Sequence, residues 1–160
     1  MIVAIACDHA GFPLKAKAMD AIRKAGHEVL DLGTESTEPV DYPDFAERLG
    51  QAIQSGEAWR GILLCGSGVG ACIAANKMHG VYAAICHDTY SAHQGVEHDE
   101  MNVLCMGSRI IGPELVRELV LNFLGARFLG NDPGGERHAR RVRKVRMIEA
   151  ENLGSKGPHS

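Results

Sequence analysis

The chain of 160 residues carries 17 lysines and arginines against 20 aspartates and glutamates, which gives a formal net charge of −3. At roughly 100–200 residues per domain, this length predicts one domain that can bury a sizeable core. A hydrophobic share of 45% and a charged share of 23% are ordinary for a globular protein and argue against disorder. The acidic balance argues against a dedicated nucleic-acid or membrane-surface binder, because such a protein would carry a basic excess.

Five cysteines are scattered along the chain without a Cys-x-x-Cys pair. A disulfide framework is therefore not expected, and a reduced, cytoplasmic compartment fits this usage better. The apolar start at residues 1–6 meets Asp8 without a basic leader, which is unlike a signal peptide. The longest uncharged stretch, residues 61–76, contains four glycines and falls short of the ~20 apolar residues of a membrane-spanning helix. We expect no membrane partner.

Short apolar runs alternate with longer helical patterns, which is typical of an α/β protein with a parallel sheet and crossover helices. The expected strands are residues 2–7, 28–32, 61–65, 82–86 and 103–106. The expected helices are residues 13–25, 42–55, 69–78, 89–95, 113–124 and 136–152. The runs VAIAC, GILLC and YAAIC are apolar throughout, as strands covered on both faces should be. We predict one domain over residues 1–152 and a flexible tail over residues 153–160.

Ligands of open α/β sheets bind outside the carboxyl ends of the strands, so polar segments next to strands are candidate sites. Three such segments stand out: residues 7–11 after the first strand, 65–70 after the third, and 98–102 before the fifth. In the second, glycines enter a helix and present N–H groups that can hold a phosphate, a carboxylate or an oxyanion. Cys65 sits at the mouth of this glycine nest, where a helix N-terminus favours the thiolate.

Other interpretations of these residues remain open. The pattern Gly66-x-Gly68-x-x-Ala71 fits a relaxed dinucleotide fingerprint, but it follows the third strand and not the first. The glycines are also consistent with turn chemistry, and Cys65 with a small core residue. The basic run over residues 137–146 fits a solvated amphipathic face, or a DNA-binding helix with salt-sensitive affinity. The histidines lack metal-site spacing, so we expect no metal, and His98 is the best candidate proton carrier.

Six sequence motifs occur in a fixed order along the chain. They are Cys-Asp-His-Ala-Gly-Phe at 7–12, Asp-Tyr-Pro at 41–43, Cys-Gly-Ser-Gly-Val-Gly at 65–70, Ala-Ala-Asn-Lys at 74–77, Asn-Val-Leu-x-Met-Gly-Ser-Arg at 102–109 and Gly-Gly-Glu-Arg-His-x-x-Arg at 134–141. Together, over about residues 2–150, they resemble type B ribose-5-phosphate isomerase and its relatives that act on galactose and allose 6-phosphates. The resemblance implies a three-layer α/β/α sandwich around a Rossmann-like, five-stranded parallel sheet. It also implies a homodimer or dimer of dimers with shared active sites, no metal and no organic cofactor.

The resemblance assigns roles to individual residues. Isomerisation moves a proton between C1 and C2 through a cis-enediolate, which needs a base, oxyanion donors, a ring-opening acid/base and a phosphate clamp. Cys65 matches the base and His98 the ring-opening residue. The anion hole matches Gly66, Ser67 and Gly70, the sugar contacts match Asp8 and Tyr42, and the clamp matches His9, Arg109, Arg137, His138 and Arg141. The segment with His98 and Arg109 is expected to complete the site that the Cys65 nest of a neighbouring chain begins.

Two features depart from the family's pattern. Asp99 stands where ribose-5-phosphate isomerases usually have asparagine, so a carboxylate replaces an amide beside the sugar. The insertion Asn131-Asp132-Pro133 precedes the clamp helix. The predicted reaction is the interconversion of ribose 5-phosphate and ribulose 5-phosphate, with allose or galactose 6-phosphate or a tetrose 4-phosphate as alternative substrates. A dinucleotide-binding module is the alternative of a different class.

Overall fold

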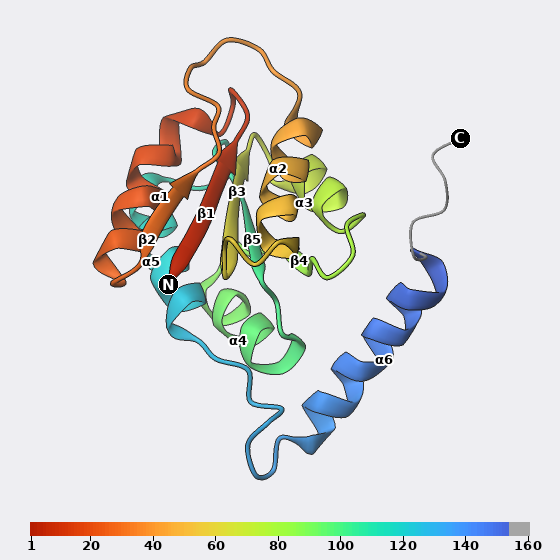
Figure 1. Cartoon of the computed structure of the whole chain (residues 1–160). Coiled ribbons are helices and arrows are strands. Elements are labelled where there is room, and N and C mark those ends of the chain that lie inside the picture. The colour runs from red at the N-terminus through yellow and green to blue at the C-terminus, as the bar shows by residue number, and fades with distance from the viewer. Residues whose placement is uncertain (154–160) are drawn as a thin grey trace.

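The computed structural model describes residues 1–153 of the chain (Figure 1). The strands are β1 (Ile2–Cys7), β2 (Glu28–Asp31), β3 (Arg60–Cys65), β4 (Ala83–Ile85) and β5 (Val103–Gly107). The helices are α1 (Phe12–Lys24), α2 (Tyr42–Gln54), α3 (Val69–Ala75), α4 (Thr89–Asp99), α5 (Pro113–Gly125) and α6 (Glu136–Asn152). Every expected strand and helix is present. The expected tail lies outside the described residues from residue 154 onward.

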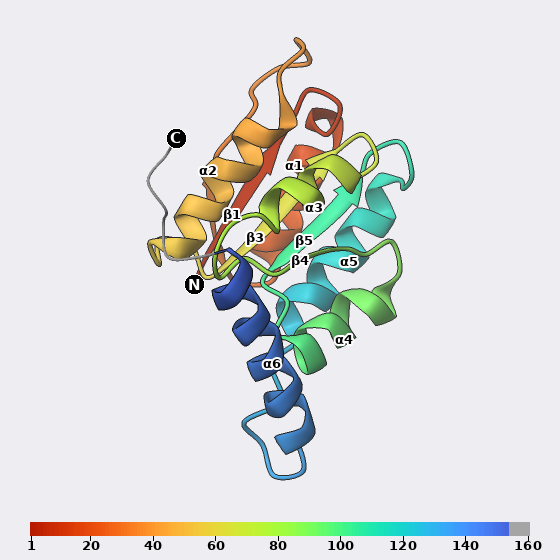
Figure 2. The ribbon, with the colours of Figure 1, turned by 90° about the vertical axis from the view of Figure 1, so that its right-hand side faces the viewer.

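The five strands form one parallel sheet in the order β2-β1-β3-β5-β4. Helices α1, α4 and α5 cover one face and α2 and α3 cover the other (Figure 2). The predicted α/β/α sandwich is thus confirmed. The chain leaves β1 toward one face and β3 toward the other, so a crevice opens between their carboxyl ends, where ligands of such sheets bind.

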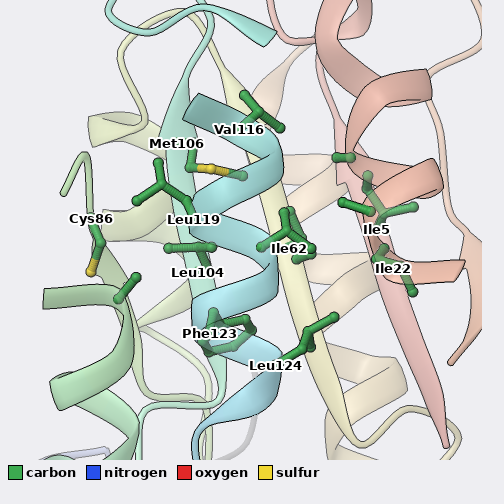
Figure 3. Close-up of a cluster of buried hydrophobic side chains, with 14 of the residues drawn as sticks. Ile5, Ile22, Ile62, Cys86, Leu104, Met106, Val116, Leu119, Phe123 and Leu124 are labelled. Atoms are coloured by element: carbon green, nitrogen blue, oxygen red, sulfur yellow. The ribbon is translucent and has the colours of Figure 1, made fainter. Parts of the chain in front are cut away.

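Two hydrophobic cores lie on opposite faces of the sheet because side chains alternate along each strand. On one face, Ile5, Ile62 and Leu104 pack against Ile22 of α1 and Phe123 of α5 (Figure 3). The other core includes Leu63 and Cys65, which face α2 and α3. This alternation aims the Cys65 thiol at the layer that contains α3.

The YAAIC run is not covered on both faces as expected. Strand β4 lies at the edge of the sheet, is half-exposed, and leaves Ile85 37% exposed. Strand β5, which follows it in sequence, inserts between β3 and β4 and is buried throughout. An apolar run of this length therefore marks a strand but not its place in the sheet.

Helix α4 extends four residues beyond its expected end at Gly95. Glycine fits this position of the helix because the Met101 side chain packs against its bare backbone. The Met101 Sδ lies 3.2 Å from where a Cβ of residue 95 would lie. The helix ends where Glu100 adopts a left-handed conformation with φ of 57°. As a consequence, His98 and Asp99 belong to the last turn of α4.

Helix α6 extends outside the three layers, at the end of the molecule where α4 lies (Figures 1 and 2). Its carboxyl-terminal half is tied to the body by polar contacts. Glu149 accepts hydrogen bonds from the Gly80 N–H at 2.7 Å and from the Tyr82 hydroxyl at 2.9 Å, and Arg146 pairs with Glu100. Among residues 1–153, no helix has the length and apolar character needed to cross a membrane.

Close backbone packing between the carboxyl ends of β1 and β3 depends on Gly11, where a Cβ would overlap the Leu64 carbonyl. We expect Gly11→Ala to lower the free energy of unfolding by about 1–3 kcal/mol, the usual cost of overpacking. Urea denaturation at one fixed protein concentration measures this change. Gly125→Ala is the matched control, because a Cβ there meets no atom within 4 Å. Equal unfolding midpoints for the two variants would contradict this account.

Candidate active site

The Cys65 thiol lies at the end of β3, directly before the turn into α3. It is 5% exposed, and its Sγ accepts a hydrogen bond from the Gly68 N–H at 3.1 Å. The turn needs glycine at residue 68, because its φ of 84° is a left-handed conformation that side chains disfavour. The first N–H groups of a helix lack partners within the helix, so this turn offers donors to an anion next to the thiol.

A pocket of about 390 Å³ opens beside this turn. Its walls come from the segments after β1, β3 and β5 and from the start of α2. The lining residues are Asp8, His9, Ala10, Tyr42, Cys65, Gly66, Ser67, Gly70, Arg109 and Ile110. The structure therefore brings together the sequence-predicted residues of four distant motifs.

Asp8 and His9 are both held in place by backbone N–H groups. The Asp8 side chain, 7% exposed, accepts a hydrogen bond from the Gly11 N–H at 2.9 Å. The Nδ1 atom of His9 accepts one from the Val40 N–H at 3.1 Å. A nitrogen that accepts carries no proton, so the neutral His9 ring holds its proton on Nε2, where it can donate to a ligand.

Two glycines make room for the large polar side chains of the pocket. A Cβ on Gly70 would lie 2.6 Å from the Tyr42 ring, so the ring rests on the bare backbone of α3. A Cβ on Gly66 would lie 3.3 Å from the Arg109 guanidinium. A cation and a phenol thus lie against two glycines of the turn, and both can contact an anionic, hydroxyl-rich ligand.

A second group of predicted residues gathers where α4 meets the start of α6. The His98 and His138 rings stack with their centroids 4.0 Å apart. The Nδ1 atom of His98 accepts a hydrogen bond from the Gln94 amide at 2.7 Å, so the neutral ring carries its proton on Nε2. A pocket of about 200 Å³ lies beside the two rings. Its lining residues are His98, Leu129, Asp132, Pro133, Gly134, Gly135, Arg137 and His138.

The electrostatics of this second pocket are cationic. Burial lowers the pKa of His138, and the neighbouring His98, Arg137 and Arg141 lower it further, while Asp99 opposes them. The Nδ1 atom of His138 has no hydrogen-bond partner among the described residues. A neutral imidazole between two arginines is suited to bind an anion as a hydrogen-bond donor rather than as a charge.

The two groups of residues lie at opposite ends of the parallel strands. Cys65 pairs with Gly107 at the carboxyl end of β5, whereas His98 and Asp99 lie just before the amino end of that strand. A strand of five residues, at roughly 3.3 Å per residue, separates them by about 15 Å. Within one chain, Cys65 and His98 therefore do not form one site.

Arg109 corrects the grouping that the resemblance implied. It was expected to complete a neighbour's site together with His98, but it follows β5 and lines the pocket of Cys65 in its own chain. The phosphate-clamp candidates are consequently divided. His9 and Arg109 lie with Cys65, whereas Arg137, His138 and Arg141 lie with His98.

The four cysteines other than Cys65 differ in the pKa of their thiols. Burial raises the pKa of Cys7 and of Cys86 to about 11, and the pKa of Cys105 is raised by its thiol contact with Cys72 and by burial. Half-buried Cys72, in contrast, has its pKa lowered to about 7, chiefly by the hydrogen bond from Cys105. Helix α3 thus carries a thiol of lowered pKa at Cys72, which is absent from the lining of the Cys65 pocket.

Some pocket residues were missed by the sequence analysis. Ala10 and Ile110 line the Cys65 pocket. The Ser108 hydroxyl holds Ala10 in place by donating a hydrogen bond to its carbonyl at 2.5 Å. Ser108 stands within the motif at 102–109, so the signal was present but not assigned a role. Among residues 1–153, no three His, Cys, Asp or Glu side chains gather as metal ligands.

Comparison with known proteins identifies the family. The family model described as Ribose/Galactose Isomerase matches residues 3–145. The chain is 43% identical over 147 residues to ribose-5-phosphate isomerase B of Escherichia coli, covering 92% of this chain and 95% of that relative. It is also 43% identical over 148 residues to D-erythrulose-4-phosphate isomerase of Pectobacterium atrosepticum, covering 92% of this chain and 94% of that relative.

A solved structure gives the same result. Ribose-5-phosphate isomerase B of Clostridium thermocellum superposes with a TM-score of 0.88 at 43% identity, covering 94% of this chain and 99% of that one. The alternative of a dinucleotide-binding module loses its basis, because these full-length matches account for the glycine turn. The chain belongs to the ribose/galactose isomerase family of sugar-phosphate isomerases.

Proposed function

We propose that the chain is a cytoplasmic isomerase that interconverts ribose 5-phosphate and ribulose 5-phosphate. The observation that carries this proposal is the Cys65 pocket, where a thiol, a glycine-rich turn, a carboxylate and a cation line one cavity. Aldose–ketose isomerisation moves a proton between neighbouring carbons of one molecule. The proposed reaction therefore needs neither a metal nor an organic cofactor.

The Cys65 thiolate acts as the base in this proposal. It removes the proton from C2 of the open-chain aldose and returns it to C1, while the proton of the C2 hydroxyl moves to the C1 oxygen of the enediolate. The developing enediolate oxygen binds in the anion hole formed by Gly66, Ser67 and Gly70. Asp8 and Tyr42 hold the sugar hydroxyls, since both line the pocket next to the thiol.

The second group of residues completes the site from another copy of the chain. His98 opens the sugar ring, and Arg137, His138 and Arg141 bind the phosphate with His9 and Arg109. Because one strand length separates the Cys65 group from the His98 group within a chain, we favour a homodimer or a dimer of dimers with shared active sites. Exposed apolar side chains on the elements that carry the two groups support such an interface: Val69, Ile73 and Ile110 on α3 and after β5, and Tyr90, Val145 and Ile148 on α4 and α6.

The identity of the sugar substrate rests on fewer observations than the type of reaction does. The two curated relatives act on a pentose and a tetrose phosphate by name and are equally similar to this chain. Asp99, exposed in the last turn of α4, accepts hydrogen bonds from hydroxyls and cannot donate to a carbonyl. We rank ribose 5-phosphate first, with an allose, galactose or other hexose 6-phosphate and a tetrose 4-phosphate as alternatives.

Cys65→Ala tests the thiol base. Turnover of ribose 5-phosphate should fall at least ~10²-fold, the usual contribution of a positioned base, while the Michaelis constant changes little. Cys72→Ala is the matched control, because Cys72 carries a thiol of lowered pKa that lies outside the pocket. Steady-state kinetics with both variants decides the assignment. Near-parental turnover in Cys65→Ala, or a large loss in Cys72→Ala, would place the base elsewhere.

Arg137→Ala and Arg141→Ala test the phosphate clamp. These residues share one face of α6, and removing either should weaken phosphorylated substrates by roughly 1.5–3 kcal/mol, seen as a raised Michaelis constant and weaker inhibition by inorganic phosphate. Arg143→Ala removes the same charge from another face of the helix and should leave both quantities near the parental values. If all three variants behave alike, general electrostatics rather than a clamp explains the effect.

His98→Asn tests ring opening. Pentose 5-phosphates are mostly cyclic, whereas erythrose 4-phosphate has its O4 blocked and cannot close the five-membered ring. We therefore expect the variant to lose turnover of ribose 5-phosphate at least ~10²-fold while turnover of erythrose 4-phosphate changes much less. The ratio of the two losses, measured on one protein preparation, is the readout. Equal losses on both sugars would remove the ring-opening role.

A further inference from the structure

The imidazole of His87 occupies a position that a strand would otherwise fill. Strand β4 pairs with β5 through Ile85 and Cys105, and the last rung joins the Cys86 N–H to the Cys105 carbonyl at 3.2 Å. Strand β5 continues to Gly107 beyond this rung. There the Gly107 N–H donates to Nε2 of His87 at 2.9 Å.

The direction of this hydrogen bond follows from the sheet. The Ser108 N–H donates to the Cys65 carbonyl at 2.9 Å on the β3 side, so the Gly107 N–H before it points to the β4 side. No backbone carbonyl of β4 reaches that far along β5, and the His87 side chain supplies the acceptor instead. The ring accepts on Nε2, so in its neutral form it carries its proton on Nδ1.

The Gly107 backbone in turn supports the glycine turn of the candidate active site. A Cβ on Gly107 would lie 2.6 Å from the Ser67 carbonyl carbon, and a Cβ on Gly68 would lie 3.2 Å from the Met106 carbonyl carbon. The two main chains are therefore in direct contact. The same turn carries the Gly68 N–H that donates to the Cys65 sulfur.

We propose that His87 is a positioning residue for the reaction, an inference that rests on the proposed role of Cys65. It fixes Gly107, Gly107 fixes the Ser67–Gly68 backbone, and this backbone sets the donors around the thiolate and the oxyanion. His87 is absent from the lining of the Cys65 pocket, so it acts through the backbone and not on the substrate. The requirement is for an acceptor at the position of Nε2.

Three substitutions separate the acceptor from the bulk of the ring. His87→Gln can place its Oε1 near the position of Nε2 and should retain turnover within about threefold. His87→Leu removes the acceptor at similar size, and His87→Asn is polar but too short to reach Gly107. We expect both to lower turnover roughly 10- to 100-fold with a nearly constant Michaelis constant, as for small misplacements in an active site.

A second readout needs no substrate. In a Cys72→Ala background, the rate of Cys65 alkylation by iodoacetamide is followed by peptide mass spectrometry. His87→Leu and His87→Asn should slow it roughly two- to tenfold because the Gly68 donor no longer stabilises the thiolate, and His87→Gln should not. His93→Leu, which removes a half-buried histidine that binds Asn122 and Glu97, is the matched control and should change neither readout.

Several outcomes would overturn the inference. Parental turnover and alkylation in both His87→Leu and His87→Asn would do so, as would a His87→Gln variant as impaired as His87→Leu. A rise in the Michaelis constant that matches the loss of turnover would make His87 a substrate contact instead. If His87→Leu fails to fold, the comparison of Gln with Asn decides. A parent inactive on sugar phosphates would defeat the proposed function, whereas the alkylation rates would still decide the role of His87.

Discussion

Parallel pairing places the carboxyl ends of β1, β3 and β5 side by side at one edge of the sheet. Most of the Cys65 pocket follows from this polarity, because Asp8, Cys65 and Arg109 lie at or just beyond the carboxyl ends of these strands. The same polarity sends His98 to the opposite edge, since it precedes β5 in the chain. The fold thus places one half of the proposed active site at each end of the strands. A second copy of the chain is the simplest way to bring the two halves together.

Glycine determines how closely the strand ends approach. At Gly11 and Gly107 a side chain would collide with the backbone of the β3 segment, and at Gly70 it would displace the Tyr42 ring. The glycine-rich motifs therefore serve packing and chemistry together, because the backbone that packs closely is also the backbone that presents N–H donors to the ligand. This dual use explains why a glycine pattern alone does not distinguish a turn from a binding site.

Much of the fold was predictable from local pattern. Apolar runs and helix punctuation placed all the strands and helices, because periodicity and capping are properties of neighbouring residues. The edge position of β4 and the insertion of β5 beside β3 were not predictable, since strand order depends on contacts between distant segments. The end of α4 was missed at Gly95, where a tertiary contact with Met101 outweighs the low helix propensity of glycine.

The sequence predicted which residues belong to the candidate site better than it predicted how these residues are grouped in space. Motif spacing collected most of the residues that the pocket contains, but Arg109 was grouped with His98 although it lies beside Gly66 of its own chain. Residues that act through the backbone left little signal, because Ser108 stands in a motif without an assigned role and His87 lies outside all six motifs. Such roles become visible when hydrogen-bond partners are known, because a donor and its acceptor here are 20 residues or more apart in sequence.

The central claim is that Cys65 of one chain and His98 of another form a single active site, and subunit mixing tests it most directly. Cys65→Ala and His98→Asn proteins, each impaired on ribose 5-phosphate, are combined in equal amounts and allowed to exchange subunits. A mixed dimer then contains one site with both defects and one with neither, so random exchange should restore up to about a quarter of the parental activity. No recovery after exchange has been verified by native mass spectrometry would show that both residues act within the same chain.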